Sequence, residues 1–284
     1  MSQRLFIRAA QKIYKAIPFL AVRKLLFRTF ALLMRRRRSV VVTVDGITYD
    51  LDLGELCDLC IYLQYYEPEV VAAMNRYTRP GMTIIDVGAN IGAHALRFAK
   101  LTGPAGRVVA FEPTDFAFAK LARNLSLNAM PHVTAVKAAL SDKVLPAQEI
   151  NFRSSWRTNN SRKDWTSTVP FERLDAWLER NGLDRVDIMK VDIDGNEYPF
   201  IVGARETIAR NRPLMFMEVV GPHLDDDARN PFLVLEGLGY RFRDSVTGAP
   251  QTIDDLRRRT PRNDVKISTS FNIIALPPAL QEPE

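Results

Sequence analysis

Short apolar segments alternate with amphipathic segments from Thr83 onward, and this alternation constrains the fold more than any other feature of the sequence. The apolar runs, among them IID, VVAF and MFMEV, are continuous. Continuous runs indicate strands that are covered on both faces, as in parallel sheets. The pattern therefore predicts a doubly wound, mostly parallel α/β sheet. The predicted strands are TIIDVG, RVVAFEP, VTAVKAAL, VDIMKVDID and PLMFMEVV, with helices near Ala93–Leu101, Phe116–Asn128 and Pro199–Arg210.

Segments with other patterns flank or interrupt this alternation. VVVTVDGITYDLDL alternates with a period of two around Asp45-Gly46 and predicts a hairpin, and a helix is expected over Glu67–Tyr77. Residues 151–173 are polar, so we expect an insertion over one edge of the sheet, and NIIALPP predicts a final strand. The expected parts are a basic amphipathic arm (1–38), a hairpin and helical lead-in (39–80), a sheet domain (81–278) with the insertion, and a disordered tail (279–284).

Basic residues are concentrated in the arm. Eleven of the 39 Lys and Arg residues precede Asp45, where there is no Asp or Glu, so the remainder of the chain has 28 basic residues against 33 acidic ones. Charges interrupt the arm too often for the ~20 apolar residues of a membrane-spanning helix. No uninterrupted apolar core of a signal peptide is present either. We favour a helix lying on an anionic membrane surface, in a cytoplasmic protein that is peripheral on the inner membrane face. The alternative is a helical lid packed on the body.

The two cysteines form the motif CDLC, at Cys57 and Cys60. This spacing is that of a redox pair or of half a zinc site. There is no second CxxC, and the three histidines are His94, His132 and His223. We interpret the cysteines as two thiols one turn apart on a partly buried helix, in a protein of a reducing compartment.

The motif DVGANIGAHALRFAK places an acid and two glycines in the first predicted strand-to-helix turn. Gly88 allows the backbone to approach a ligand closely. Asp86, at the strand end, would repel a pyrophosphate but suits a ligand with a positive end. Glu112 ends the next predicted strand, where a carboxylate can accept both hydroxyls of a ribose. A nucleoside with amino and sulfonium groups, S-adenosylmethionine, meets both demands. A glycine-rich turn without a ligand is the alternative.

The motifs YEPE, DVGANIG, VVAFEP, NLSLN, AALSD and IMKVDIDGNEYPFIVGA follow one another in order over about Tyr66 to Val219. Together they resemble the FkbM family of S-adenosylmethionine-dependent methyltransferases. The resemblance implies a class I methyltransferase fold and, often, O-methylation of sugars in secondary metabolites or surface glycans. It implies that Glu112 holds the ribose and that Ser141 and Asp142 lie near the adenine. The complete predicted set of cofactor contacts is Glu67, Asp86, Gly88, Ala89, Asn90, Gly92, Glu112, Pro113, Ser141 and Asp142.

The acidic stretch KVDIDGNE, residues 190–197, follows the fourth predicted strand and lies beside the expected cofactor crevice. An acceptor hydroxyl loses its proton during methyl transfer, and a positioned base accelerates such steps ~10²–10⁴-fold. Strand alternation would put Lys190, Asp192 and Asp194 on one side. We predict that Asp192 and Asp194 orient the acceptor and that Glu197 supports them. His223, with Glu218 nearby, is the rival base.

Two other interpretations of these acids stay open, a Mg²⁺ or Ca²⁺ site and a purely structural role. An EF-hand is excluded, because its loop needs glycine at the sixth position and Gly195 is fourth counting from Asp192. Asp194 stands where the FkbM family commonly has Glu, and its side chain has the shorter reach. We predict S-adenosylmethionine as the cofactor and do not favour a metal.

The predicted insertion interleaves arginine and tryptophan. Indole rings stack on sugars and guanidinium groups pair with phosphates, so we predict that Trp156, Arg157 and Trp165 bind the acceptor. A mobile solvated loop is the alternative. The leading hypothesis is an O-methyltransferase acting on a sugar hydroxyl of a glycan, glycolipid or related glycoconjugate. Its acceptor would be a sugar-containing small molecule or a lipid-linked glycan.

Three other functions compete with this hypothesis. The arm and the arginines at 257–259 motivate an RNA methyltransferase, but the acidic body and the lack of an NPPY-like tetrapeptide argue against a nucleic-acid partner. The second is a natural-product O-methyltransferase. The third is a catalytically inactive scaffold that recruits partners to a membrane, which the intact acids of the cofactor motifs disfavour.

Overall fold

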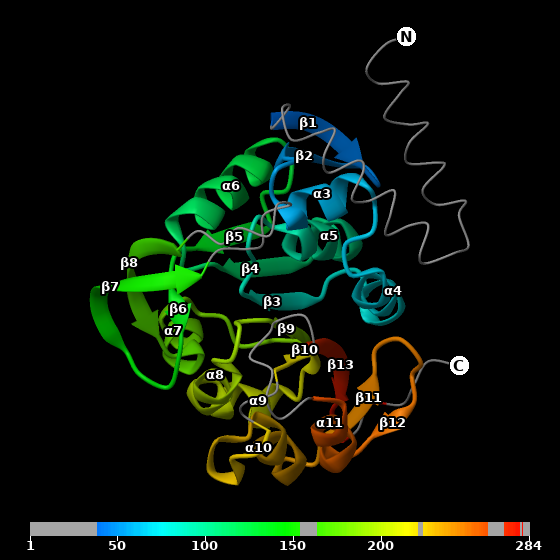
Figure 1. Cartoon of the computed structure of the whole chain (residues 1–284). Coiled ribbons are helices and arrows are strands. Elements are labelled where there is room, and N and C mark those ends of the chain that lie inside the picture. Colours follow the sequence, from blue (N-terminus) through cyan, green and yellow to red (C-terminus); the bar gives the residue numbers. More distant parts are fainter. Residues whose placement is uncertain (1–38, 154–163, 221–223, 261–269, 279, 281–284) are drawn as a thin grey trace. The chain divides into compact units, whose positions relative to one another are not determined.

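A computed structural model of the chain describes residues 39–153, 164–220, 224–260, 270–278 and 280 (Figure 1). The chain divides into two compact units. The first comprises residues 1–68 with 126–128 and 151–165, and the second comprises the remainder. The predicted arm lies outside the described residues. Within the described part of the chain, no helix is long and apolar enough to span a membrane.

The first unit contains the predicted hairpin, in which β1 (Ser39–Val44) pairs antiparallel with β2 (Ile47–Asp52). Asp45 and Gly46 have φ angles of 49° and 77°, the left-handed values that a tight two-residue hairpin turn requires. Helix α3 (Leu56–Tyr62) follows, and its Asp58 accepts a hydrogen bond of 2.5 Å from the backbone N–H of Asp52. This bond ties the helix to the end of β2.

The cysteines of the CDLC motif lie on α3, as expected. Cys57 is buried, Cys60 is half-buried, and both are free thiols. Burial raises the pKa of Cys57 well above its usual value, and burial with the nearby charge of Glu67 raises the pKa of Cys60 to about 12. Both thiols are therefore protonated at neutral pH, which favours packing over redox or zinc chemistry.

The second unit is built on an eight-stranded sheet with the order β12-β11-β13-β10-β9-β3-β4-β5. The five strands from β10 to β5 in this order are parallel, and β13, β11 and β12 are antiparallel to their neighbours. This confirms the predicted doubly wound, mostly parallel α/β sheet. The strands are β3 (Thr83–Val87), β4 (Arg107–Phe111), β5 (Val133–Val136), β9 (Ile188–Val191), β10 (Leu214–Val219), β11 (Arg241–Asp244), β12 (Pro250–Gln251) and β13 (Phe271–Leu276).

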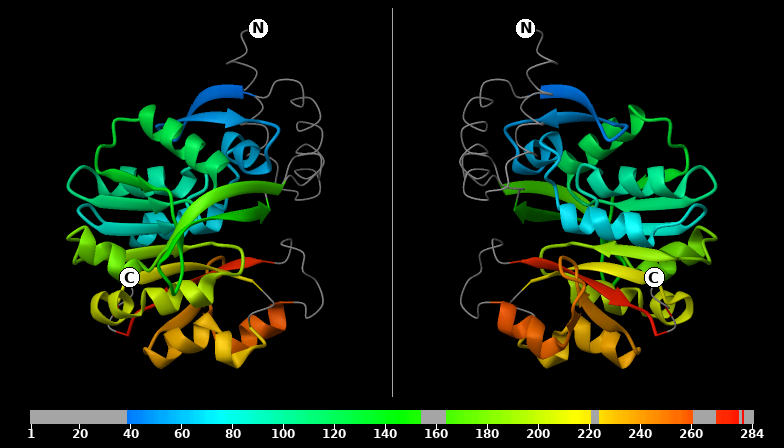
Figure 2. Two further views of the ribbon diagram at one scale, coloured as in Figure 1. Left: turned by 90° about the vertical axis from the view of Figure 1, so that its left-hand side faces the viewer. Right: turned by 90° about the vertical axis from the view of Figure 1, so that its right-hand side faces the viewer.

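Helices pack against both faces of this sheet (Figures 1 and 2). Phe216 belongs to one core and its neighbours Met215 and Met217 to the other, because successive strand residues face opposite sides. On the Phe216 face lie α4 (Pro68–Tyr77), α5 (Ala93–Thr102) and α6 (Asp115–Ser126). On the other face lie α7 (Leu174–Arg180), α8 (Glu197–Gly203), α9 (Arg205–Asn211), α10 (Pro231–Gly237) and α11 (Ile253–Arg259), with the short 3₁₀ helix η2 (Asp227–Arg229) before α10.

The structure differs from the predicted elements in three places. VTAVKAAL is not one strand, because after β5 the chain turns and β6 (Ala139–Leu140) joins a separate sheet of order β6-β8-β7. The predicted insertion is partly strand, since β7 (Leu145–Arg153) and β8 (Asp164–Glu172) frame residues 154–163. The single helix expected over Pro199–Arg210 is two helices, because α8 ends at Gly203, where a Cβ would lie 1.9 Å from the carbonyl oxygen of Ser141.

Candidate active site

The turn from β3 to α5 is held against β4 and approaches β9 closely. The backbone N–H groups of Gly88 and Ala89 donate to the carbonyl oxygen of Phe111, at 3.0 and 2.9 Å. Gly88 has φ 80°, and a Cβ placed on it would lie 1.9 Å from the carbonyl oxygen of Asp192. Only glycine fits this contact. The first motif and the acidic stretch, more than a hundred residues apart in sequence, therefore meet at the carboxyl ends of β3 and β9.

Glu112 organises the same crevice from the end of β4. One carboxylate oxygen accepts the backbone N–H of Asn90 at 2.9 Å, and the other accepts the N–H and hydroxyl of Thr114 at 2.8 and 2.5 Å. Burial raises the pKa of Glu112, and these hydrogen bonds oppose the shift. The two carboxylate oxygens carry four lone pairs and these bonds use three, so one acceptor site remains for a ribose hydroxyl, on the oxygen that accepts from Asn90.

The remaining predicted cofactor residues fall into two groups. Asp86 is 1% exposed at the end of β3, and the turn continues through Asn90 (φ 49°) and Gly92 (φ 89°) into α5. Pro113 follows Glu112 directly, and Ser141 with Asp142 follows β6. Glu67 lies in the first unit, directly before α4. All ten assignments stay predictions.

The tight glycine turn and the paired strand-end carboxylates fit a nucleoside cofactor with a cationic centre. Gly88 allows close approach of a ligand, Glu112 offers an acceptor for a hydroxyl, and Asp86 contributes a second carboxyl group. Bound there, S-adenosylmethionine would supply an electrophilic methyl group.

The acidic cluster (Asp192, Asp194, Glu197 and Glu218) gathers at the carboxyl ends of β9 and β10. Lys190 is 2% exposed, and its Nζ donates to Oδ2 of Asp192 at 2.7 Å. The side chain of Asp192 is 24% exposed, so one face of it is open to solvent. β9 ends at Val191, and Asp194 sits in the following turn with φ 52°. The expected strand alternation therefore holds for Lys190 and Asp192 but not for Asp194.

Three members of the acidic cluster, Glu218, Glu197 and Asp194, have raised pKa values. Burial, followed by the charge of Asp192, raises the pKa of Glu218 to about 9; a hydrogen bond with Asp192 adds to the rise, and one with Ser270 opposes it. Glu218 is therefore neutral at pH 7 and can donate to Asp192. Burial raises the pKa of Glu197 to about 7, and its Oε1 accepts the N–H groups of Ile193 and Gly195. Desolvation and the charge of Asp192 also raise the pKa of Asp194.

Several predicted residues cannot be placed in the site. His223, Trp156 and Arg157 lie outside the described residues. Trp165 belongs to β8, of which the backbone is described at that position. His94 is buried within α5, in keeping with a packing role, and the ring Nε2 of His132 lies 3.0 Å from the carbonyl oxygen of Ala99.

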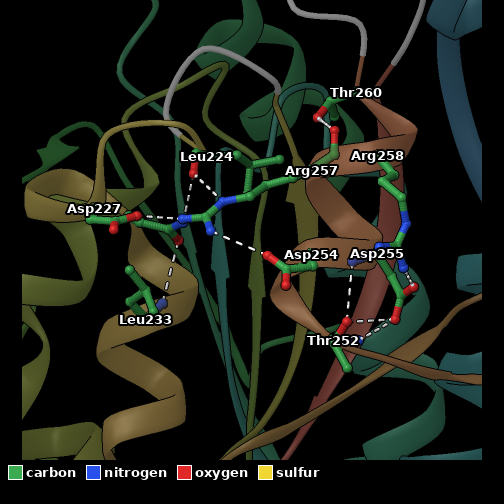
Figure 3. Close-up of polar contacts among 10 residues, drawn as sticks. Leu224, Asp227, Leu233, Thr252, Asp254, Asp255, Arg257, Arg258 and Thr260 are labelled. Carbon is green, nitrogen blue, oxygen red and sulfur yellow. Dashed lines mark hydrogen bonds and ion pairs between the residues drawn. The ribbon is translucent and has the colours of Figure 1, made fainter.

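The structure also bears on two alternatives raised by the sequence, a metal site and RNA binding. Among the residues that the structure describes, no three His, Cys, Asp or Glu side chains are grouped to hold a metal ion. The arginines that motivated RNA binding are paired with carboxylates: Arg257 with Asp227 and Asp254, and Arg258 with Asp255 (Figure 3). Arg259 pairs with Asp244 at 2.6 Å. A phosphate backbone would have to compete with these carboxylates.

Sequence reasoning missed three contributors to the site. Lys190 was placed beside Asp192 but given no role, although opposite charges two residues apart at a strand end signal an ion pair. Thr114 follows Glu112 by two residues, a spacing at which a hydroxyl can reach back to a strand-end carboxylate. Ser270, which bonds Glu218, gave no signal because it directly precedes β13, far from Glu218 in the sequence.

The mostly parallel sheet, with the glycine turn and the strand-end carboxylates at its carboxyl edge, is a class I methyltransferase fold. The family model described as "Methyltransferase FkbM domain" matches residues 86–242, more than half of the chain. The chain therefore belongs to the FkbM methyltransferase family, as the sequence motifs predicted.

The individual relatives share low sequence identity with this chain. The chain is 27% identical over 153 residues to 2-O-methyltransferase NoeI of Sinorhizobium fredii, a match covering 47% of this chain and 62% of that protein. It is 28% identical over 157 residues to methyltransferase sdnD of Sordaria araneosa, covering 43% and 60%. The chain thus matches about three fifths of the length of each. The solved FkbM methyltransferase of Methylobacillus flagellatus is 14% identical with a TM-score of 0.40, covering 89% of this chain and 60% of that one.

Proposed function

We propose that this chain is an O-methyltransferase that transfers the methyl group of S-adenosylmethionine to a sugar hydroxyl of a glycan, glycolipid or related glycoconjugate. The observation that carries the proposal is the contact between the cofactor turn and the acidic cluster, where Gly88 leaves no room for a Cβ beside the backbone of Asp192. A carboxylate at this position lies where an acceptor hydroxyl must lose its proton. The relative from Sinorhizobium fredii is named a 2-O-methyltransferase, which supports oxygen as the acceptor atom.

Within the cluster, Asp192 is the best-suited base among the described residues. Glu197 is buried and bonded to the turn that it supports, and Glu218 is protonated at neutral pH. Asp192 is partly open, and Lys190 fixes one of its oxygens at 2.7 Å. The acceptor hydroxyl would donate to Asp192 and pass its proton there as the new O–C bond forms and the methyl–sulfur bond breaks, with S-adenosylhomocysteine as the leaving group. Asp194, exposed in the next turn, would orient the acceptor, and His223 stays the rival base.

We further propose that the arm holds the enzyme at an anionic membrane surface, where lipid-linked glycans are presented. Its eleven basic residues without an acidic one support this idea. Trp156, Arg157 and Trp165 are proposed to bind the sugar, because indole and guanidinium groups suit glycans and phosphates.

The test is methyl transfer from radiolabelled S-adenosylmethionine to three fractions: lipid-linked glycans, free oligosaccharides and total RNA. We expect label in a glycan fraction, retained after mild alkali because a methyl ether survives where a methyl ester is cleaved. Replacing Arg35–Arg38 by Gln should lower the rate on vesicle-borne acceptor but not on detergent-dispersed acceptor. Label in RNA alone, or label released by alkali, would contradict the proposal.

A further inference from the structure

A cavity of about 240 Å³ lies beside α4 at the turn that joins β11 to β12. Its charged lining residues are Arg76 of α4 and Arg243 and Asp244 of β11. Ser245 and Thr247, both in the turn, add hydroxyl groups to the lining. None of these residues belongs to the cofactor crevice, so the cavity is a second candidate site.

The cavity and the acidic cluster are on the same face of the sheet. Arg243 is the register partner of Ile274, and Ile274 is the partner of Phe216. Phe216 is the partner of Lys190, which binds Asp192. Paired residues of neighbouring strands project from the same face. The ring of Tyr77 on α4 lies 6.5 Å from that of Phe216, which places α4 over this face as well.

The separation between the two sites is short. Glu218 is the register partner of Asn272, and Asn272 accepts a 3.3 Å hydrogen bond from the backbone N–H of Ser245. Neighbouring strands lie 4.7–4.9 Å apart, so the backbone of Ser245 is about 10 Å from that of Glu218. A short oligosaccharide with one hydroxyl at the acidic cluster can reach the cavity.

The charge presented to the cavity is positive. The lining contains two arginines and one acid, Asp244, whose carboxylate is bonded within the turn. Asp244 accepts from Arg259 at 2.6 Å and from the N–H groups of Val246 and Thr247. Burial opposes its ionisation, but the bonds from Thr247 and Arg259 hold its pKa below the usual value. The negative charge of Asp244 is thus compensated within the turn and by α11.

Arg243 is fixed at the cavity wall. Its Nη1 donates to the carbonyl oxygen of Gly248 at 2.8 Å, which orients the planar guanidinium. The hydroxyl of Thr247 donates to Asp244 at 2.9 Å, so the donors toward the cavity are the two arginines and the hydroxyl of Ser245. This set suits phosphate, carboxylate or sulfate oxygens. The volume is below the range of about 300–1,000 Å³ typical of complete small-molecule sites, so the cavity suits one group of a larger ligand.

We infer that this cavity is a subsite for an anionic group of the acceptor, a phosphate, carboxylate or sulfate carried near the sugar that is methylated. The inference rests on the proposed function for the identity of the ligand. It makes the substrate class narrower: charged glycoconjugates should be preferred to neutral ones with the same sugar.

The test uses the full chain without cofactor and measures binding of glucose 1-phosphate, glucuronate and neutral methyl glucoside by calorimetry. At least one anionic probe should bind at least ten times more tightly than methyl glucoside. The probe with the higher affinity, glucose 1-phosphate or glucuronate, shows whether the cavity prefers phosphate or carboxylate. Arg243→Gln and Arg76→Gln should each weaken that binding at least fivefold. Arg205→Gln, an exposed arginine on α9 at the other face, should not change it.

The affinity of the same variants for S-adenosylmethionine should stay within twofold of the wild-type value. This control shows that the variants are folded and that binding at the cofactor site is unchanged. Equal binding of the anionic probes by wild type and by both cavity variants would overturn the inference, as would equal affinity for charged and neutral probes. Because these assays need no methyl transfer, their outcome is independent of whether the chain methylates sugars.

Discussion

At the scale of single residues, Gly88 connects the cofactor turn to the acidic strand end. Its φ of 80° lies in the left-handed region, and the carbonyl oxygen of Asp192 occupies the space of a Cβ. Two constraints, backbone angle and close contact, therefore coincide at one position. Gly81 has the same φ of 80°, but a Cβ added there would meet nothing within 4 Å.

This pair of glycines separates backbone strain from steric contact. Gly81→Ala should cost roughly 1 kcal/mol of stability and leave affinity for S-adenosylmethionine unchanged, because it introduces only the left-handed strain. Gly88→Ala should weaken S-adenosylmethionine binding more than tenfold, because the turn must move away from Asp192. Titration calorimetry and denaturant unfolding of the two variants measure both quantities. Matching effects of the two changes would contradict the assigned role of Gly88.

At the scale of elements, the acidic cluster depends on β9, β10 and β13 together. Glu218, one residue before the end of β10, pairs with Asn272 of β13, and its neutral carboxyl can donate to Asp192 beyond β9. The pKa of Glu218 is about 9 in the folded chain and 4.5 by its usual value. Between these two pH values the folded chain holds a proton on Glu218 that is released on unfolding. The free energy of unfolding therefore falls as pH rises through this window.

The pH dependence of stability should be altered by Glu218→Gln, since glutamine mimics the protonated acid. The range from pH 7.5 to 9 lies above the pKa of about 7 of Glu197, so the titration of Glu197 contributes little there. Over this range the wild type should lose about 1–2 kcal/mol of unfolding free energy through Glu218. The variant should lose distinctly less, and Glu236→Gln, exposed on α10, should behave as wild type. Denaturant titrations at both pH values measure this. Parallel losses in all three proteins would refute the protonated state of Glu218.

Much of the site was predictable because strand ends are local features of sequence. Apolar runs ending in Asp86 and Glu112 predicted two neighbouring strand ends, and KVDIDGNE predicted a third beside them, which β3, β4 and β9 form as parallel neighbours. What escaped prediction depends on tertiary pairing. The end of β9 at Val191 moved Asp194 into a turn, and β8 was hidden in a polar stretch because its alternating Thr and Ser residues resemble a loop.

At the scale of the whole molecule, the described parts of the second unit put cofactor turn, acidic cluster and basic cavity along one sheet. Asp86, Lys190, Phe216, Ile274 and Arg243 follow one another across five strands in direct register. Negative charge therefore lies where the methyl group and hydroxyl would meet, and positive charge lies farther along the same face. This ordering predicts an acceptor with a neutral sugar at the centre and an anionic group toward β11.

The most direct test of this account is single-turnover methyl transfer by Asp192→Asn with saturating S-adenosylmethionine and the labelled glycan fraction. We expect a rate about 10²–10⁴-fold below wild type, the range that a positioned base contributes, with an affinity for S-adenosylmethionine within twofold of wild type. Asp184→Asn, the same change before the opposite end of β9, should keep the wild-type rate. A transfer rate of Asp192→Asn within threefold of wild type would contradict the central claim that acceptor and methyl group meet at Asp192.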